Sequence, residues 1–192
     1  MRWLFLFLTV GCTPHLVSDF EEITGENWEV PENEWGVVVP PQDLVGEGFS
    51  QGQVPFDFRL KDQNGESVSL WQFYGSVIIL DVSTMWCRPC QEIARHVEKT
   101  YQDYRDDGFM YLTLLAEDLH SNRPGIGELN DWADNFGIES VPVIQDDGGY
   151  CDSVEATGTY PAVLLIDREM RVVAERLTPS DEVIRSAIED VL

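Results

Sequence analysis

The stretch that most constrains this chain is an apolar, β-branched run that ends shortly before two closely spaced cysteines. Residues 77–82 read VIILDV, and Cys87 and Cys90 follow. Such a run predicts a buried strand, and the pattern of residues 91–104 predicts a helix directly after the cysteines. The first turn of a helix offers unpaired N–H groups and a partial positive charge, which favour a thiolate over a thiol. We therefore predict that a buried strand delivers two cysteines to the start of a helix.

The positions of the two cysteines predict different roles for them. Cys87 lies nearer the strand and is expected to be the exposed nucleophile, because the thiolate is the species that attacks disulfides. Cys90, one helical turn on, is placed to attack the resulting mixed disulfide and release the product. Pro89 suits the first helical turn, where its missing N–H is not needed. The pattern predicts a thiol–disulfide oxidoreductase whose redox group is the Cys87–Cys90 disulfide itself, with no other cofactor.

Composition excludes several other classes of protein. The net charge of −23 argues against a nucleic-acid partner, since phosphate binding needs clustered Lys and Arg. It also argues against adsorption to anionic lipid through a basic patch. The four cysteines do not have zinc-site spacing, and the three histidines lie far apart, so we expect no metal site.

The first residues resemble the export signal of a bacterial lipoprotein. A brief basic start leads into the apolar run 3–10, which is far too short to span a bilayer. Gly11 and Cys12 follow directly, as in a lipobox, although Thr9 stands where Leu is usual. The resemblance implies cleavage after residue 11, a lipid on the Cys12 sulfur, and a periplasmic protein held on a bacterial membrane, with the outer membrane favoured. The alternative is an ordinary secretion signal that is cut further on and removes Cys12.

Residues 12–53 are interpreted as an acidic tether. The chain has no Lys or Arg from residue 13 to residue 58, while acids, prolines and glycines recur. This composition favours a solvated, self-repelling linker between membrane and domain. The alternative is a docking segment that packs on the domain or on a partner through Trp28, Trp35 and the valines at 37–39.

Residues 54–192 have the pattern of one α/β domain. Strands are expected at 54–60, 66–70, 76–82, 109–115, 162–166 and 171–175, and helices at 91–104, 127–136 and 181–192. Ser180 is expected to cap the last helix, and Gly137 lies just past the end of the second. This order predicts a mixed sheet flanked by helices, preceded by an extra N-terminal β-hairpin.

With the motif WCRPC at residues 86–90, this order resembles the thioredoxin fold, and the extra hairpin resembles the redoxin and TlpA-like branch. Two further segments support the likeness: residues 141–146 resemble the family's Phe-Pro-Val-Leu-x-Asp segment, and Tyr160–Pro161 precede a strand. The family carries a cis-proline there, facing the cysteine pair. The resemblance implies a membrane-tethered thiol–disulfide oxidoreductase outside the cytoplasm, with protein thiols or disulfides as clients and an upstream redox partner. We expect a monomer.

The resemblance also assigns a role to Asp81, six residues before Cys87. Thioredoxin has a buried acid at this position that helps to deprotonate the second cysteine, here Cys90. An unpaired buried carboxylate is costly, so it should hold a proton readily. The alternative is a carboxylate at a strand end that simply meets solvent.

Four residues are expected to contact the substrate. A cis Pro161 would leave the backbone of Tyr160 free to pair with an extended client strand. Trp86 is expected to form a flat apolar wall beside Cys87. The charge of Arg88 should favour the thiolate and a more oxidising couple. Nearby acids such as Glu92 oppose this effect, so the direction of catalysis stays open at this level.

Several questions stay open at this level. Cys151 is either a third redox thiol or a small buried hydrophobic residue. A peroxiredoxin-like peroxidase is a rival function, since Thr84 and Cys87 form Thr-x-x-Cys, although Leu80 stands where that family has Pro. A metallochaperone or assembly factor on the same fold, and a scaffold with a static disulfide, are rivals without catalysis.

Overall fold

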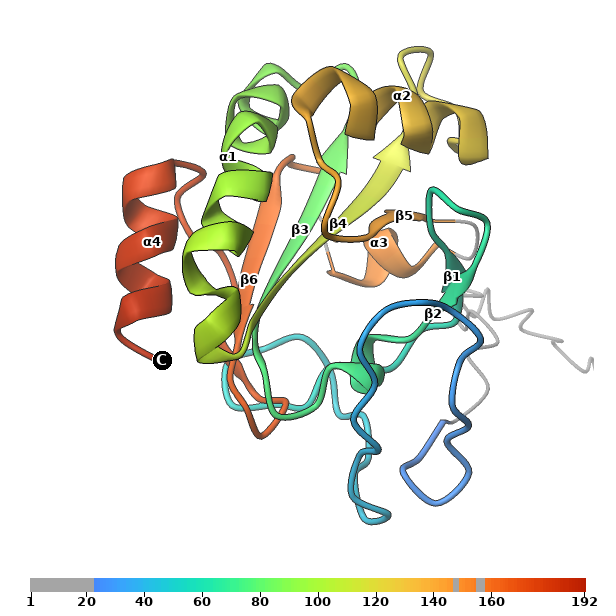
Figure 1. Cartoon of the computed structure of the whole chain (residues 1–192), viewed down its shortest axis with the longest axis vertical. Coiled ribbons are helices and arrows are strands. Elements are labelled where there is room, and N and C mark those ends of the chain that lie inside the picture. The colour runs from blue at the N-terminus through green and yellow to red at the C-terminus, as the bar shows by residue number, and fades with distance from the viewer. Residues whose placement is uncertain (1–22, 147–148, 155–157) are drawn as a thin grey trace, which may run out of the picture.

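The computed structural model describes residues 23–146, 149–154 and 158–192, and its centre is a five-stranded mixed sheet. The strand order is β5-β4-β3-β6-β7 (Figure 1). The strands are β3 (Val77–Thr84), β4 (Phe109–Glu117), β5 (Val143–Gln145), β6 (Ala162–Ile166) and β7 (Val172–Ala174). The mixed sheet that the sequence predicts is therefore confirmed.

The apolar run that precedes the cysteines forms the central strand. All eight residues of β3 are buried, because strands cover both of its edges and other elements cover both faces. It pairs in parallel with β4 and antiparallel with β6. The β4–β5 pair is parallel and the β6–β7 pair is antiparallel, as expected for the final hairpin.

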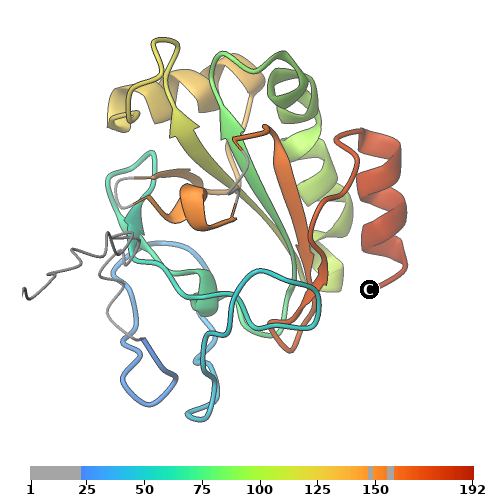
Figure 2. The same ribbon diagram turned by 180° about the vertical axis from the view of Figure 1, so that it is seen from behind.

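Three helices cover one face of the sheet (Figures 1 and 2). They are α1 (Arg88–Tyr104), α2 (Ile126–Phe136) and α4 (Asp181–Glu189). Both parallel crossovers, β3-α1-β4 and β4-α2-β5, step in the same direction across the sheet, so their right-handed connections place both helices on the same face. Ser180 caps α4 by accepting a 3.4 Å hydrogen bond from the Val183 amide, and Gly137 ends α2 with φ of 66°, as predicted.

The opposite face is covered by a short helix and by the N-terminal part of the domain (Figure 2). The helix is α3 (Tyr150–Val154), which the sequence pattern did not indicate. The predicted hairpin is present but short: β1 (Leu60–Lys61) pairs with β2 (Ser67–Val68), and the 3-10 turn η1 (Leu70–Gln72) follows. A second 3-10 turn, η2 (Arg105–Asp107), ends α1.

The acidic segment is packed on the domain from residue 23 onward, which corrects the interpretation of a solvated tether for residues 23–53. Trp28 is only 9% exposed, and its Nε1 donates to the Ser69 hydroxyl. Trp35 Nε1 donates a 2.7 Å hydrogen bond to Asp62, and Val38 pairs with Phe73. Residues 23–53 are therefore a docked segment, because the two indoles find acceptors around the hairpin. The predicted signal, Cys12 and the rest of the tether lie outside the described residues.

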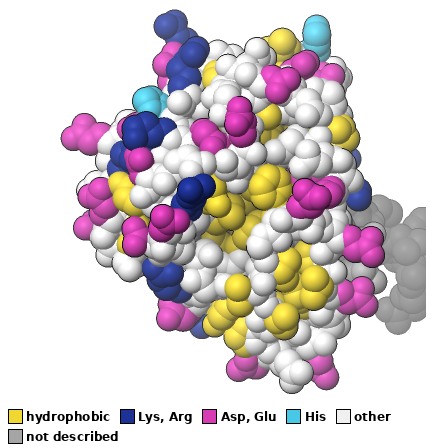
Figure 3. Space-filling view, viewed as in Figure 1, with side chains coloured by type: hydrophobic (Ala, Val, Ile, Leu, Met, Phe, Trp, Pro, Cys, Tyr) yellow, Lys and Arg dark blue, Asp and Glu magenta, His cyan; other side chains and the backbone are white. Residues whose placement is uncertain are grey.

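The surface reflects the acidic composition of the chain. Figure 3 shows acidic side chains spread over the face that carries α1 and α4, with exposed hydrophobic side chains in the lower half of the view. Among the described residues, no helix is both long and apolar enough to cross a bilayer.

Candidate active site

The cysteine pair lies where β3 gives way to α1. Cys87 is the N-cap of α1, with extended φ and ψ of −78° and 113°, and its Sγ lies 3.2 Å from the backbone nitrogen of Cys90. An N-cap acceptor satisfies one of the N–H groups that the first turn leaves unpaired. Pro89 lies in that turn, as the sequence predicts. The helix begins at Arg88, three residues earlier than its pattern indicated.

The two cysteines form a disulfide, with their Cα atoms 5.2 Å apart. Cys90 is fully buried, and Cys87 is 4% exposed. The prediction of an openly exposed nucleophile is therefore too strong for this oxidised form, because the disulfide turns the Cys87 sulfur toward the first turn of the helix. The expected asymmetry remains, since Cys87 is the only one of the pair with any accessible surface.

Trp86 directly precedes Cys87 in the sequence and is largely exposed. Its side chain is 45% exposed, unusually open for Trp, and its Nε1 donates a 2.6 Å hydrogen bond to Glu117 Oε2. Its ring meets the ring of Tyr160 edge to face, with centroids 6.1 Å apart. Sequence reasoning missed Glu117. The signal available was that Glu117 ends the strand next to β3, because parallel neighbours end at the same sheet edge.

The Tyr160–Pro161 peptide bond is cis, as the resemblance predicts. Ala162, the next residue, pairs with Val82 near the end of β3, which places the cis bond at the edge of the sheet where the cysteines lie. Tyr160 and Pro161 are half-buried. Arg88 is exposed at the first position of α1.

Asp81 is fully buried in the middle of the sheet, between Thr113 of β4 and Val163 of β6. The alternative of a strand-end carboxylate in solvent is excluded. Burial raises the pKa of Asp81 to about 7, because a charged carboxylate is poorly solvated there. Hydrogen bonds from the hydroxyls of Ser83 (2.7 Å) and Tyr111 (3.5 Å) act in the opposite direction. Sequence reasoning did not identify either donor.

Cys151 is a free, buried cysteine in α3. Burial, followed by the nearby Asp146 carboxylate, raises the pKa of its thiol well above the usual value. Because a protonated thiol is a poor nucleophile, this environment fits the small hydrophobic residue rather than a third redox group.

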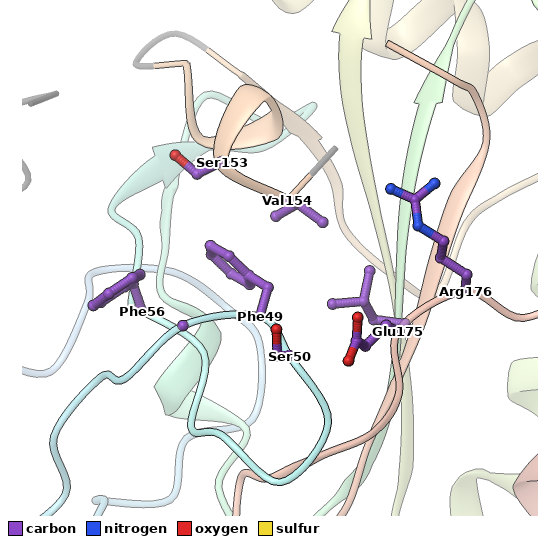
Figure 4. A pocket seen from close by; sticks show the side chains of 9 residues that line it. Phe49, Ser50, Phe56, Ser153, Val154, Glu175 and Arg176 are labelled. Carbon is purple, nitrogen blue, oxygen red and sulfur yellow. The ribbon is translucent and has the colours of Figure 1, made fainter. Parts of the chain in front are cut away.

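Two other features of the described residues bear on what the protein could bind. No group of three or more His, Cys, Asp or Glu side chains is arranged there to hold a metal ion. A surface pocket of about 340 Å³ opens beside α3, and Figure 4 shows Phe49 and Val154 lining it, with Glu175 and Arg176 at its other side. It contains none of the predicted site residues.

Comparison with known proteins identifies the family of this chain. The model of the AhpC/TSA family matches residues 51–175. The thioredoxin-like protein YneN of Bacillus subtilis is 26% identical over 122 residues, which are 64% of this chain and 68% of YneN. The thiol-disulfide oxidoreductase ResA of Halalkalibacterium halodurans is 27% identical over 124 residues, which are 64% of this chain and 65% of ResA.

Solved structures show the same fold. A thiol:disulfide interchange protein from Bacteroides sp. aligns with a TM-score of 0.61 and 21% identity, covering 74% of this chain and 90% of that one. A putative thiol:disulfide interchange protein DsbE from Chlorobium tepidum aligns with a TM-score of 0.61 and 22% identity, covering 74% and 95%. Since the family model covers well over half of the sequence, this chain belongs to the AhpC/TSA family, and its fold is the thioredoxin fold of these interchange proteins.

Proposed function

We propose that this protein is an extracytoplasmic thiol–disulfide oxidoreductase that exchanges disulfides with protein clients through Cys87 and Cys90. One observation carries the proposal: the pair is joined as a disulfide across the N-cap and first turn of α1, with Cys90 fully buried and Cys87 4% exposed. The relatives named thiol-disulfide oxidoreductase support the same activity.

The chemistry follows from that asymmetry. In the reduced protein, the Cys87 thiolate attacks one sulfur of a client disulfide, and the other client sulfur leaves as a thiolate that takes up a proton. The Cys90 thiolate then attacks Cys87 in the mixed disulfide and expels the second client sulfur. The client gains two electrons, and the Cys87–Cys90 disulfide of this structure forms. The reverse sequence oxidises a client, and the reduction potential of the pair relative to its redox partner sets the direction.

In this proposal, each step is assisted by a charged group or by the helix end. The N-terminal end of α1 stabilises the Cys87 thiolate, and the exposed guanidinium of Arg88 adds positive charge there. Asp81 accepts the proton of Cys90, since both are fully buried and a carboxyl with a pKa of about 7 exchanges protons near neutral pH.

The client binds beside the disulfide as an extended segment. Tyr160 and Pro161 directly precede β6 at the end of the sheet where the cysteines lie, so a client strand can pair with the backbone of Tyr160. Trp86 offers an exposed aromatic face next to Cys87, supported by Tyr160. These contacts hold the client sulfur in line with the nucleophile.

The protein is held by a lipid on Cys12 at the periplasmic side of a bacterial membrane. The support is the apolar run followed by Gly11 and Cys12. The pneumococcal exposed lipoprotein thioredoxin of Streptococcus pneumoniae shares the fold, with a TM-score of 0.58 and 20% identity. Radiolabelled palmitate should enter the full-length protein and should not enter a Cys12→Ala variant; equal labelling of both would contradict lipidation.

A trapping experiment tests the activity. A Cys90→Ser variant should hold its client as a covalent adduct at Cys87, because the resolving thiol is missing, and mass spectrometry can locate the bond. A Cys87→Ser/Cys90→Ser double variant is the matched control and should retain nothing. Absence of adducts, together with peroxide consumption that Cys87→Ser abolishes, would instead make the protein a thiol peroxidase.

A further inference from the structure

A small group of polar side chains interrupts the apolar sheet face beneath α1. Asp81 and Ser83 lie two residues apart on β3, and Tyr111 and Thr113 lie two apart on β4, so each pair shares a face. Asp81 and Thr113 are register partners on the parallel strands, which places all four side chains on the same side. The Phe109 ring contacts both Tyr111 and Tyr104 of α1, which identifies this side as the α1 face.

Within this group the Asp81 carboxylate has one strong hydrogen-bond donor. The Ser83 hydroxyl is 2.7 Å from Asp81 Oδ1, the usual length for such a bond, and both side chains are fully buried. The Tyr111 hydroxyl is 3.5 Å from Oδ2, at the outer limit. In the described part of the chain the Thr113 hydroxyl makes no hydrogen bond, although it belongs to the register partner of Asp81.

No other ionisable group that the structure describes around Asp81 stabilises its charged form as the two hydroxyls do. On α1, Cys90 is held in its disulfide, and His96 lies 3.8 Å from Asp181 of α4, which acts on Tyr111. On the other side of the sheet, Cys151 of α3 is within electrostatic range. Among the described residues no Lys, Arg or His forms an ion pair with Asp81. The groups that lower the pKa of Asp81, against the effect of burial, are Ser83 and Tyr111.

We propose that Ser83 is a positioning residue for Asp81, which it holds in the ionised form that accepts the proton of Cys90. The inference rests on the proposed function and adds a residue that sets the pH above which the mixed disulfide resolves. A hydroxyl that donates to a carboxylate stabilises the charged form, so removal of Ser83 makes Asp81 a base only at higher pH. Ser83 acts through Asp81 and does not touch the client.

The test compares three single variants by the pH dependence of the resolving step, followed with a fluorogenic peptide disulfide. Ser83→Ala should shift the acid limb of the pH–rate profile by about one unit toward higher pH. At a given pH on that limb, the resolving step should then be about tenfold slower. Tyr111→Phe should move it less, because its bond is longer. Thr113→Val is the matched control, which removes a buried hydroxyl from the same face without removing a bond, and should leave the profile in place.

A second measurement is independent of turnover. Titration of the Asp81 carboxyl by ¹³C NMR in the disulfide form should show the same upward shift in Ser83→Ala and none in Thr113→Val. In an Asp81→Asn background, adding Ser83→Ala should produce no further change in the pH profile. A shift that persists without Asp81 would mean that Ser83 acts on the fold rather than on the acid.

The outcomes separate this inference from the activity itself. An active protein whose profile and carboxyl titration do not move in Ser83→Ala, or move equally in Thr113→Val, overturns the role of Ser83. An active protein whose profile is unchanged in Asp81→Asn overturns the role of Asp81 as well. Purified wild-type protein without exchange activity toward any disulfide peptide overturns the proposed function instead.

Discussion

The indole Nε1 of Trp28 donates a 2.9 Å hydrogen bond to the hydroxyl of Ser69, 41 residues away in the sequence. Ser69 in turn lies 2.8 Å from both oxygens of the buried Asp57 carboxylate. The Arg59 guanidinium stacks 5.3 Å from the centre of the Trp28 ring and also donates to the carbonyl of Glu29. These contacts attach the acidic N-terminal segment to the domain.

The first prediction concerns this attachment. Trp28→Phe keeps most of the buried ring but removes the donor to Ser69, so it should lower the free energy of unfolding by about 1–2 kcal/mol in urea titrations. Val30→Ala, in an exposed position of the same segment, is the control and should change it by less than about 0.5 kcal/mol. Equal stabilities of wild type and Trp28→Phe would show that the segment is not docked in solution.

The second prediction concerns the pH dependence of stability. Burial raises the pKa of Asp57 from 3.8 to about 6, against the effect of its hydrogen bonds and of Arg59. A carboxyl whose pKa is raised in the folded state contributes its full stability below pH 3.8, the pKa in the unfolded chain. This contribution is lost as the pH rises through about 6, the pKa in the folded protein. The loss is about 3 kcal/mol. Asp57→Asn should therefore flatten the fall in stability between about pH 4 and pH 7.

Urea titrations at several pH values measure this slope. Asp106→Asn is the matched control, because the side chain of Asp106 is 95% exposed, and its slope should equal that of the wild type. The comparison concerns slopes, since Asp57→Asn also changes the bonds to Ser69 and Trp71. A slope unchanged by Asp57→Asn would mean that Asp57 does not titrate as a buried acid.

The third prediction separates the cysteines. Cys87→Ser should reduce disulfide exchange to the uncatalysed background, because the attacking thiolate is gone. Cys151→Ala should retain the wild-type rate, because its buried thiol has a raised pKa and is a poor nucleophile, and it should lose only about 1–2 kcal/mol of stability. Insulin reduction and urea unfolding measure the two effects, and loss of exchange in Cys151→Ala would make Cys151 part of the redox pathway.

The fourth prediction concerns the hydrogen bond between Trp86, next to Cys87 in the sequence, and Glu117. Glu117→Ala removes the acceptor of Trp86 Nε1, so the ring should lose its fixed orientation and KM for a protein client should rise about fivefold, with a smaller change in kcat. Glu182→Ala, a first-turn acid of α4, is the control. A fall in kcat with unchanged KM would mean that Glu117 acts on the chemistry rather than on client binding.

Much of the site follows from local patterns. The run at 77–82 specifies a buried strand by its apolar, β-branched side chains, and the spacing of Cys87 and Cys90 places both sulfurs in one helical turn. Pro89 and Ser180 mark helix starts because capping depends on neighbours within a few residues. The cis bond before Pro161 came instead from the family resemblance.

Other features depend on residues that meet only in the folded chain. The contact of Trp28 with Ser69 shows that the interpretation of a free linker was wrong for this segment. Acidic composition indicates average solvation, but it does not indicate which hydrogen-bond acceptors the two indole groups will meet in the folded chain. Glu117 and Tyr111 reach Trp86 and Asp81 from the neighbouring strand, through register that no local pattern specifies.

The sequence by itself determined the central strand, the presence of a helix after it and the identity of the redox pair, since these depend on side-chain periodicity and spacing over a few residues. The tertiary structure alone decided how little of Cys87 is exposed, which hydroxyls face Asp81 and where the N-terminal segment lies. These properties depend on burial and on partners far away in the sequence, because desolvation and hydrogen bonding are set by whatever the fold brings within contact distance.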